Sequence, residues 1–321
     1  MADEDRNKIV ERSGVMAVRI AVTGGTGFIG KALVKALVER GDTVWIISRQ
    51  AASTPEAADS HLRSVSWDML EKEPAILEGI DTIVNLAGES INQRWTKSAK
   101  NRVLSSRQWA AARVAKLVLS LEAKPSVVVN ASGISAYGIS ERDVFHENSP
   151  TAVTDFLSGV VKHWEEAADA IPVPRLVKLR IGLVLARKGG AFPLIALPYR
   201  LFGGGRVGSG KQGLSWIHIE DMIGLILFCL DNETVSGPVN ASAPEPVSND
   251  EFGRAVGRAL SRPHWFPVPA VLMKALFGEM STLLLDGQRA LPTKSLELGF
   301  RFCYPTLDKA MRQLLVKSHH E

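Results

Sequence analysis

Apolar residues follow two alternating patterns along the first 180 residues of the chain. Short apolar runs, of the kind that form buried parallel strands, occur at 18–22, 43–48, around Val65, and at 81–88, 126–130 and 176–180. Segments with apolar residues at helical spacing separate several of these runs, and the longest cover about 98–122 and 155–170. This alternation predicts an α/β fold with a doubly wound parallel sheet.

The pattern changes after residue 185. Residues 186–215 are rich in glycine, and prolines such as Pro244 and Pro263 separate the helical segments that follow. We therefore predict a sheet domain at 17–185 and a smaller C-terminal α/β substrate lobe at 186–321. Residues 1–16 carry charges of both signs and no apolar run, and we expect them to be a disordered or vector-derived extension.

Composition narrows the classes of partner. The net charge of +4 is spread along the chain without a basic block, so nucleic acid is not an expected partner. The longest apolar run, Met222–Leu230, is too short to span a membrane, and no membrane partner is expected. Two distant cysteines, Cys229 and Cys303, favour neither a disulfide framework nor a metal site, so we expect no metal and a cytoplasmic location. The expected partner is a small-molecule substrate, and a homodimer is allowed for.

A glycine-rich segment, TGGTGFIG, lies between the first predicted strand and the first predicted helix. Its glycines satisfy both the GxxGxxG and the GxGxxG spacing. At a strand–helix junction such glycines allow a tight turn and a close approach of backbone to pyrophosphate, which the helix N-terminus attracts. The segment therefore predicts a Rossmann-type dinucleotide-binding domain at 17–185. Its cradle would consist of Thr23, Gly24, Gly25, Thr26, Gly27, Phe28, Ile29 and Gly30.

The end of the second predicted strand indicates which dinucleotide is bound. An NAD site has Asp or Glu there for the ribose 2′-OH, whereas this strand ends in Ser48–Arg49. A guanidinium and a hydroxyl suit a 2′-phosphate, so NADP(H) is the predicted cofactor. The alternative is an NAD site beside a surface arginine. A second glycine cluster at 203–212 begins like a nucleotide-triphosphate loop but has Gln212 in place of the metal-binding hydroxyl, and we interpret it as a mobile or substrate-covering loop.

Four motifs occur in a familiar order: TGGTGFIG, NLAG (Asn85–Gly88), ASGISAYG (Ala131–Gly138) and WIHIEDM (Trp216–Met222). Together they resemble the extended or atypical short-chain dehydrogenase/reductases of the NAD-dependent epimerase/dehydratase superfamily. The region from WIHIEDM to LGFRF resembles, more narrowly, an epimerase-family group with a distinctive C-terminal segment. Its members are described as sugar epimerases or cell-division inhibitors. The resemblance covers about residues 17–316.

The resemblance implies further cofactor contacts. Leu86, Ala87 and Gly88 would line the adenine–ribose side of the cofactor. Arg102 and Arg107 could face its phosphates or ribose, although a solvated helix face is the alternative for Arg107. Val184 would lie near the nicotinamide.

The resemblance also exposes a departure from the family pattern. Members ordinarily use a Tyr, a Lys four residues later and a Ser, but none of the tyrosines here is followed by Lys at that spacing. Counting back from Glu165 places Leu157 and Val161 in the Tyr and Lys positions, and Gly133 takes the Ser position. The usual mechanism is therefore not predicted.

Substitute proton-transfer groups can be suggested from position alone. Tyr137 and Ser132 follow the fifth predicted strand, and His218 belongs to WIHIEDM. Each has a structural alternative, as a packing aromatic or a buried hydrogen-bonding group. Two functions stay open: an NADP(H)-dependent epimerase or reductase acting on an unidentified, sugar-like or nucleotide-linked molecule, and a catalytically silent NADP(H)-binding sensor or interaction protein. A link to cell division rests on the family label only.

Overall fold

A central sheet of seven parallel strands organises the protein in a computed structural model that describes residues 17–50 and 61–315. The predicted extension at 1–16 lies outside the described residues. In sheet order the strands are β11 (Gly237–Ala241), β7 (Arg175–Ile181), β5 (Val127–Gly133), β4 (Thr82–Asn85), β1 (Arg19–Thr23), β2 (Thr43–Ser48) and β3 (Leu62–Ser66). The predicted α/β fold with a doubly wound parallel sheet is confirmed.

The strand order reverses between β1 and β4. From β1 the chain proceeds outward through β2 and β3, and then returns to add β4, β5 and β7 on the other side of β1. In a sheet wound in this way, ligands bind beyond the carboxyl ends of the two strands at the reversal. The glycine-rich turn follows β1 and the NLAG loop follows β4, so both predicted cofactor loops meet at this edge.

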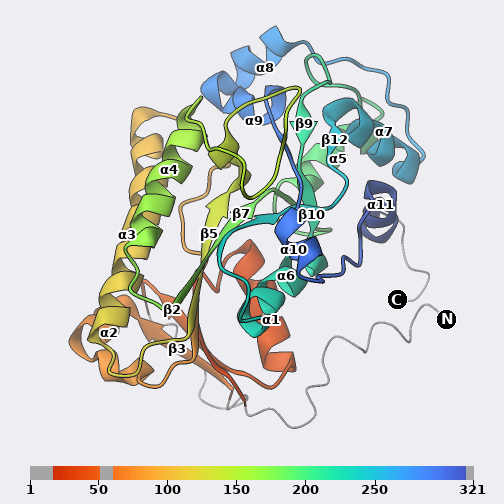
Figure 1. Cartoon of the computed structure of the whole chain (residues 1–321). Helices are drawn as coiled ribbons and strands as arrows, with labels where there is room; N and C mark the ends of the chain where they lie inside the picture. The colour runs from red at the N-terminus through yellow and green to blue at the C-terminus, as the bar shows by residue number, and fades with distance from the viewer. Residues whose placement is uncertain (1–16, 51–60, 316–321) are drawn as a thin grey trace, which may run out of the picture.

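Helices cover both faces of the sheet, as Figure 1 shows. The helices α1 (Phe28–Glu39) and α6 (Ile219–Asp231) lie together on one face, and α3 (Lys97–Ser120) and α4 (Phe156–Asp169) lie together on the other. Leu33 and Leu37 of α1 pack against Ile20 and Val22 of β1, because apolar residues three or four apart occupy one side of a helix. No helix of residues 17–50 or 61–315 is long and apolar enough to cross a bilayer.

The chain after residue 185 builds a second group of elements and also completes the main sheet. A separate apolar core contains Phe192, Trp216, Phe252 and Met311. The seventh strand of the main sheet, β11, pairs with β7. The sequence analysis did not predict this strand, because its residues GPVNA combine Gly, Pro and Asn, which are poor strand formers. The sheet is therefore not made by residues 17–185 alone.

The remaining elements are short. The helices are α2 (Trp67–Lys72), α5 (Phe192–Arg200), α7 (Asn249–Leu260), α8 (Ala270–Phe277), α9 (Thr282–Leu285), α10 (Thr293–Glu297) and α11 (Leu307–Leu315). The strands are β6 (Val144–Phe145), β8 (Leu183–Leu185), β9 (Gly213–Leu214), β10 (Trp216–His218), β12 (Val247–Ser248) and β13 (Arg289–Ala290). They pair two by two, as β8 with β10, β9 with β12 and β6 with β13.

Candidate functional site

The turn between β1 and α1 requires glycine at two positions. Gly24 has a φ of +69°, and a Cβ there would lie 2.8 Å from the backbone carbonyl of Leu86. A Cβ on Gly30 would lie 2.1 Å from the carbonyl oxygen of Gly24. The turn can therefore be tight, lie against the NLAG loop and begin a helix at once only because these side chains are absent.

Gly27 differs from the other two glycines because a side chain there would make only one close contact. A Cβ on Gly27 would meet only the Gly24 carbonyl oxygen, at 3.1 Å. Gly27 is also the N-cap of α1 and offers no side-chain cap, whereas α3, α4, α6 and α7 each begin with a capping side chain. The first N–H groups of α1 are therefore free to bind an anion, which fits the pyrophosphate of a dinucleotide.

A chain of buried polar side chains fixes the ends of three neighbouring strands. The Thr23 hydroxyl donates to Asn85 Oδ1 at 2.5 Å and accepts from the backbone N–H of Ala87 at 3.3 Å. Asn85 Nδ2 in turn donates to Asn130 Oδ1 at 2.6 Å. Thr23 therefore positions the NLAG loop through these bonds. The sequence analysis gave neither asparagine a role, although Asn85 belongs to the NLAG motif and Asn130 ends the predicted strand at 126–130.

Ser48 and Arg49 lie where the second strand ends, next to β1. The Ser48 hydroxyl donates to the carbonyl oxygen of Gln50. Arg49 is exposed, and within residues 17–50 and 61–315 its guanidinium has no hydrogen-bond or ion-pair partner. A guanidinium without a partner among the described residues can bind a phosphate, as the NADP(H) prediction requires.

The two arginines of α3 lie in different environments. Arg107 is partly buried beneath the NLAG loop, where its Nη1 donates to the carbonyl oxygens of Glu89 and Val103 and its guanidinium lies 4.9 Å from the Trp164 ring centre. Burial lowers the pKa of Arg107 to about 10, and the Glu89 carboxylate acts in the opposite direction. Arg102 lies at the surface and is bonded to Glu89 and to neighbouring polar side chains.

The loop after β8 covers the start of α1. Gly189 and Gly190 both have positive φ, and a Cβ on either would come within 2.8 Å of the Phe28 ring. Phe28 therefore packs beneath this loop. Val184, predicted to lie near the nicotinamide, is a buried residue of β8 and packs with the sheet core.

A buried ion pair occupies the carboxyl end of β5. Ser132 donates to Glu165 Oε1 at 2.6 Å, and Arg180 binds both carboxylate oxygens of Glu165, at 2.8 and 3.0 Å. Burial acts to raise the pKa of Glu165, but the hydrogen bonds and charge of Arg180 outweigh it and lower the pKa. Glu165 is therefore ionised at neutral pH and can accept a proton only weakly.

Tyr137 lies beside this pair but is held by a different partner. Its hydroxyl donates to Asn240 Oδ1 at 2.7 Å, its ring stacks on Phe145, and the Arg180 guanidinium lies 4.9 Å from its ring centre. Burial raises the pKa of Tyr137, although Arg180 acts in the opposite direction. A catalytic tyrosine of the family type needs a lowered pKa, and the residues around Tyr137 do not provide it.

The positions of the usual Tyr and Lys carry apolar side chains. Leu157 and Val161 are buried on α4, and a Cβ on Gly133 would lie 3.2 Å from Val161 Cγ2. Gly133 and Val161, in the Ser and Lys positions, therefore meet at the end of β5, but neither carries a titratable group.

His218 is buried at the start of α6. Its Nδ1 accepts from the backbone N–H of Glu220 at 3.2 Å, and its Nε2 lies 3.0 Å from Gln313 Oε1. Burial lowers the pKa of His218. These contacts describe a helix cap. The catalytic assignments of Tyr137, Ser132 and His218, and the cofactor assignments above, stay predictions. In residues 17–50 and 61–315 no cluster of three or more His, Cys, Asp or Glu side chains could hold a metal ion.

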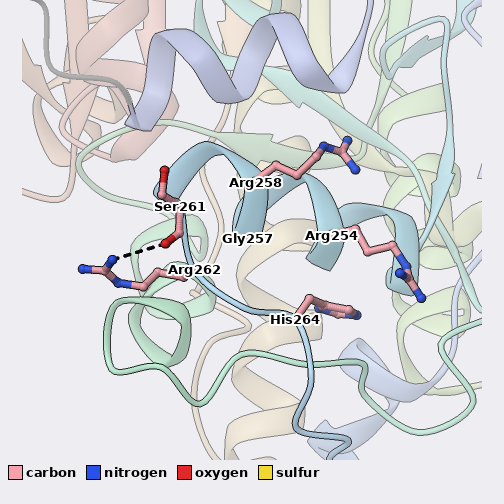
Figure 2. A pocket seen from close by; sticks show the side chains of 6 residues that line it. All are labelled: Arg254, Gly257, Arg258, Ser261, Arg262 and His264. Carbon is pink, nitrogen blue, oxygen red and sulfur yellow. Dashed lines mark hydrogen bonds between the residues drawn. The ribbon is translucent and has the colours of Figure 1, made fainter.

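A surface hollow of about 420 Å³ lies away from the glycine-rich turn, at the end of α7 (Figure 2). It is lined by Arg254, Gly257, Arg258, Ser261, Arg262 and His264. None of these residues belongs to the β1–β4 edge. His264 bridges Asp250 and Tyr199, at 2.9 Å on each side, which fixes the wall of the hollow.

Comparisons with known proteins agree with this arrangement. A family model described as the NAD dependent epimerase/dehydratase family matches residues 20–158, and a model described as a domain of unknown function matches residues 268–314. The chain is 41% identical over 300 residues to the epimerase family protein YfhF of Bacillus subtilis, which covers 93% of this chain and 98% of the relative.

Two further relatives extend the similarity to eukaryotes. The chloroplastic epimerase family protein SDR39U1 homolog of Arabidopsis thaliana is 36% identical over 302 residues, which cover 92% of this chain and 86% of the relative. The human epimerase family protein SDR39U1, whose crystal structure was solved with NADPH, superposes with a TM-score of 0.84 at 36% identity. That match covers 93% of this chain and 99% of the human chain.

Proposed function

Because the chain belongs to the NAD-dependent epimerase/dehydratase family, we propose that it binds NADP(H) and exchanges hydride with an unidentified polar small molecule. The observation that carries the proposal is the tight turn after β1, where Gly27 begins α1 without a side-chain cap and Gly24 and Gly30 leave no room for a Cβ. The NADPH in the human relative supports the choice of cofactor. Arg49, whose guanidinium has no partner among residues 17–50 and 61–315, supports it independently.

Each part of the cofactor would meet residues already described. The N–H groups at the start of α1 would bind the pyrophosphate, and Ser48 with Arg49 would bind the 2′-phosphate. Leu86 and Gly88 of the NLAG loop, which Thr23 positions, would lie along the adenine ribose. When bound, NADP(H) supplies or accepts a hydride at its nicotinamide ring.

Proton exchange would depend on Ser132 more than on Tyr137, because burial raises the pKa of Tyr137. Ser132 has a carboxylate partner in Glu165 at 2.6 Å, so its hydroxyl can be oriented and can relay a proton. Both hydroxyl-bearing residues are almost fully buried. A substrate would therefore reach them only after the segments that cover β5 move.

Titration with NADPH and NADH tests the cofactor assignment. We expect tighter binding of NADPH, and Arg49→Glu should weaken NADPH binding by roughly 10- to 150-fold while leaving NADH nearly unchanged, since hydrogen bonds to charged groups contribute about 1.5–3 kcal/mol. Lys116→Glu, an exposed charge on α3, is the matched control. Tighter binding of NADH by the unaltered protein would refute the assignment.

Hydride exchange requires a separate experiment. The protein would be incubated with NADPH deuterated at the nicotinamide C4 and with a metabolite extract, and products would be analysed for deuterium by mass spectrometry. The proposal predicts transfer of the label to at least one metabolite. Binding of NADPH without any label transfer would instead favour the second function below.

The second candidate function is a cofactor-binding sensor or interaction protein without chemistry. The apolar Leu157 and Val161, and the raised pKa of Tyr137, favour it. It predicts that a chain with both Ser132→Ala and Tyr137→Phe still restores the normal phenotype to cells that lack the gene. A chain with Arg49→Glu should not restore it. Loss of complementation by the first variant alone, with its NADPH affinity intact, would exclude the sensor.

A further inference from the structure

Two stretches of the C-terminal half contain no acidic residue. Neither 170–219 nor 252–278 contains Asp or Glu, although both carry several Lys and Arg residues. In a chain of net charge +4 with 34 acidic residues, such segments concentrate positive charge locally. Whether they form one surface depends on how the fold places them.

The structure brings the two stretches side by side. The backbone N–H groups of Trp265 and Phe266 donate to the carbonyl oxygen of Gly204, at 3.0 and 3.1 Å. Val268 N–H donates to the carbonyl oxygen of Arg206 at 2.9 Å, and Trp265 Nε1 donates to that of Phe202 at 2.9 Å. The glycine cluster at 203–212, interpreted above as a mobile or substrate-covering loop, is thus bonded to the segment that leads into α8.

Large apolar side chains project from this joint into solvent. We call them the apolar patch: Leu201, Phe202, Trp265, Phe266, Val271 and Leu276, all at least 54% exposed. On α8 only Met273 is buried, so the helix presents most of its side chains outward. Figure 1 places α8 at one extremity of the molecule, next to α9. Exposed aromatic and aliphatic residues gathered in this way mark an interaction surface.

Phe202, in the apolar patch, has a strained backbone conformation. Its φ is +62°, a left-handed conformation that is strained for a bulky residue. Its phenyl ring is 55% exposed, with the Arg262 guanidinium 4.3 Å from the ring centre. Strained residues persist where the surroundings over-determine them, frequently at sites of binding.

Basic side chains border the apolar patch, and the nearby acids already have partners. Arg200 and Arg206 are exposed beside Leu201 and Gly205. Three nearby acids have basic partners: Asp250 bonds to Arg254 and His264, Asp308 to Arg258, and Glu279 to Lys100. Asp286, which follows α9, faces Lys274 of α8. Within residues 17–50 and 61–315, Arg200 and Arg206 form no ion pair, so this border of the apolar patch carries positive charge.

We propose that the apolar patch and its basic border bind an anionic lipid bilayer at the interface, without spanning it. Trp, Phe and Leu side chains that insert at headgroup depth, flanked by Arg and Lys that meet anionic headgroups, are the combination that interfacial binding requires. Interfacial binding does not need a helix that spans the bilayer, so it is compatible with the lack of such a helix among the described residues.

Charge argues against a second copy of the chain as the occupant. A twofold dimer brings the same surface of both subunits together. Arg200 and Arg206 of one copy would then meet the stretches 170–219 and 252–278 of the other, which contain Lys and Arg but no Asp or Glu. Like charges in contact at an interface are unfavourable, whereas anionic headgroups neutralise them.

Vesicle flotation of the full chain tests the proposal. We expect the protein to float with vesicles of phosphatidylcholine and phosphatidylglycerol in equal parts, and not with vesicles of phosphatidylcholine alone. Arg200→Gln with Arg206→Gln should weaken partitioning roughly thirtyfold, since each Lys or Arg near an anionic surface contributes about a fivefold factor. Val271→Ser with Leu276→Ser should weaken it by more than about tenfold, and high salt should release the protein.

Two exposed residues of α3, outside the apolar patch, provide the controls. Leu119→Ser and Lys116→Gln remove an exposed leucine and an exposed lysine on α3, and binding should be unchanged. Circular dichroism and thermal unfolding midpoints would verify that every variant folds. We expect each to fold because all the substituted side chains are exposed. Failure to float with either vesicle, or equal flotation with both, would overturn the proposal. So would a solution dimer that Val271→Ser with Leu276→Ser dissociates.

Discussion

Replacing Gly27 with alanine should separate cofactor binding from folding. The φ and ψ of Gly27, −77° and −177°, are extended and suit any residue. The new Cβ would meet only the Gly24 carbonyl oxygen at 3.1 Å, so a shift of a few tenths of an ångström relieves the contact. Alanine is a poorer N-cap than glycine, and the free energy of unfolding should fall by less than about 1 kcal/mol.

The effect on the cofactor should be much larger. Gly27 is the N-cap of α1, so an added methyl group lies beside the N–H groups that we propose bind the pyrophosphate. Loss of one or two hydrogen bonds to a charged pyrophosphate, each contributing about 1.5–3 kcal/mol, predicts NADPH binding weaker by about two orders of magnitude. Gly30→Ala should behave differently, because its Cβ would lie 2.1 Å from the Gly24 carbonyl oxygen. We expect it to lower both stability, by about 1–3 kcal/mol, and affinity.

Calorimetric titration with NADPH and urea unfolding measure the two effects in the same variants. Gly159→Ala on α4 is the control, because the nearest atom to its Cβ would be Val153 Cγ1 at 3.8 Å. There alanine should raise the free energy of unfolding by about 1 kcal/mol and leave affinity unchanged. A folded Gly27→Ala variant that binds NADPH as tightly as the original chain would show that the pyrophosphate lies elsewhere.

The other predictions concern buried polar groups. Glu165→Gln leaves the Arg180 guanidinium buried without a carboxylate, and we expect a loss of about 3–5 kcal/mol in urea unfolding. Tyr137→Phe leaves a buried amide oxygen without its donor, and should cost about 1–3 kcal/mol while NADPH affinity is kept. His218 has a pKa below its ordinary 6.5 in the folded state, so the unfolded chain binds more protons below that pH. Stability should therefore fall as pH drops below 6.5, by up to about 1.4 kcal/mol per pH unit, and His218→Asn should reduce this slope.

Glu166, the exposed neighbour of Glu165, provides the control for the buried ion pair. Glu166→Gln removes an exposed carboxylate one residue away from Glu165 and should cost less than about 0.5 kcal/mol. Equal effects of the two substitutions would contradict the buried ion pair. Unchanged stability of Tyr137→Phe would contradict its hydrogen bond, and an unchanged acid slope in His218→Asn would assign that slope to other groups.

The sequence was sufficient for the elements that carry a strong local signal. Six of the seven strands of the main sheet were predicted because their apolar runs lie between helical segments, and the Asp155–Ala170 prediction anticipated α4, which Asp155 caps. The glycine-rich turn was predictable for the same reason, since its motif lies at a strand–helix junction. By contrast, β11 has no apolar run and is a strand only because β7 offers an unpaired edge.

Features of the site that depend on contacts between distant residues could not be predicted. The Glu165–Arg180 pair joins α4 to β7, and Asn240 reaches Tyr137 from β11. No spacing in the sequence indicates either contact. The role of His218 could not be predicted either. The WIHIEDM motif identifies the residue, but only the fold shows that its Nδ1 caps α6.

The late position of β11 in the chain bears on how the protein is made. Until residues 237–241 leave the ribosome, β7 ends the sheet with a row of unpaired backbone N–H and carbonyl groups. At about 5–20 residues per second, the interval between completion of β7 and of β11 is on the order of 3–12 s. During it the nascent chain exposes a strand edge on which other chains can pair. Truncation after residue 185 would make this state permanent, so a fragment limited to the cofactor-binding part should aggregate where the full chain does not.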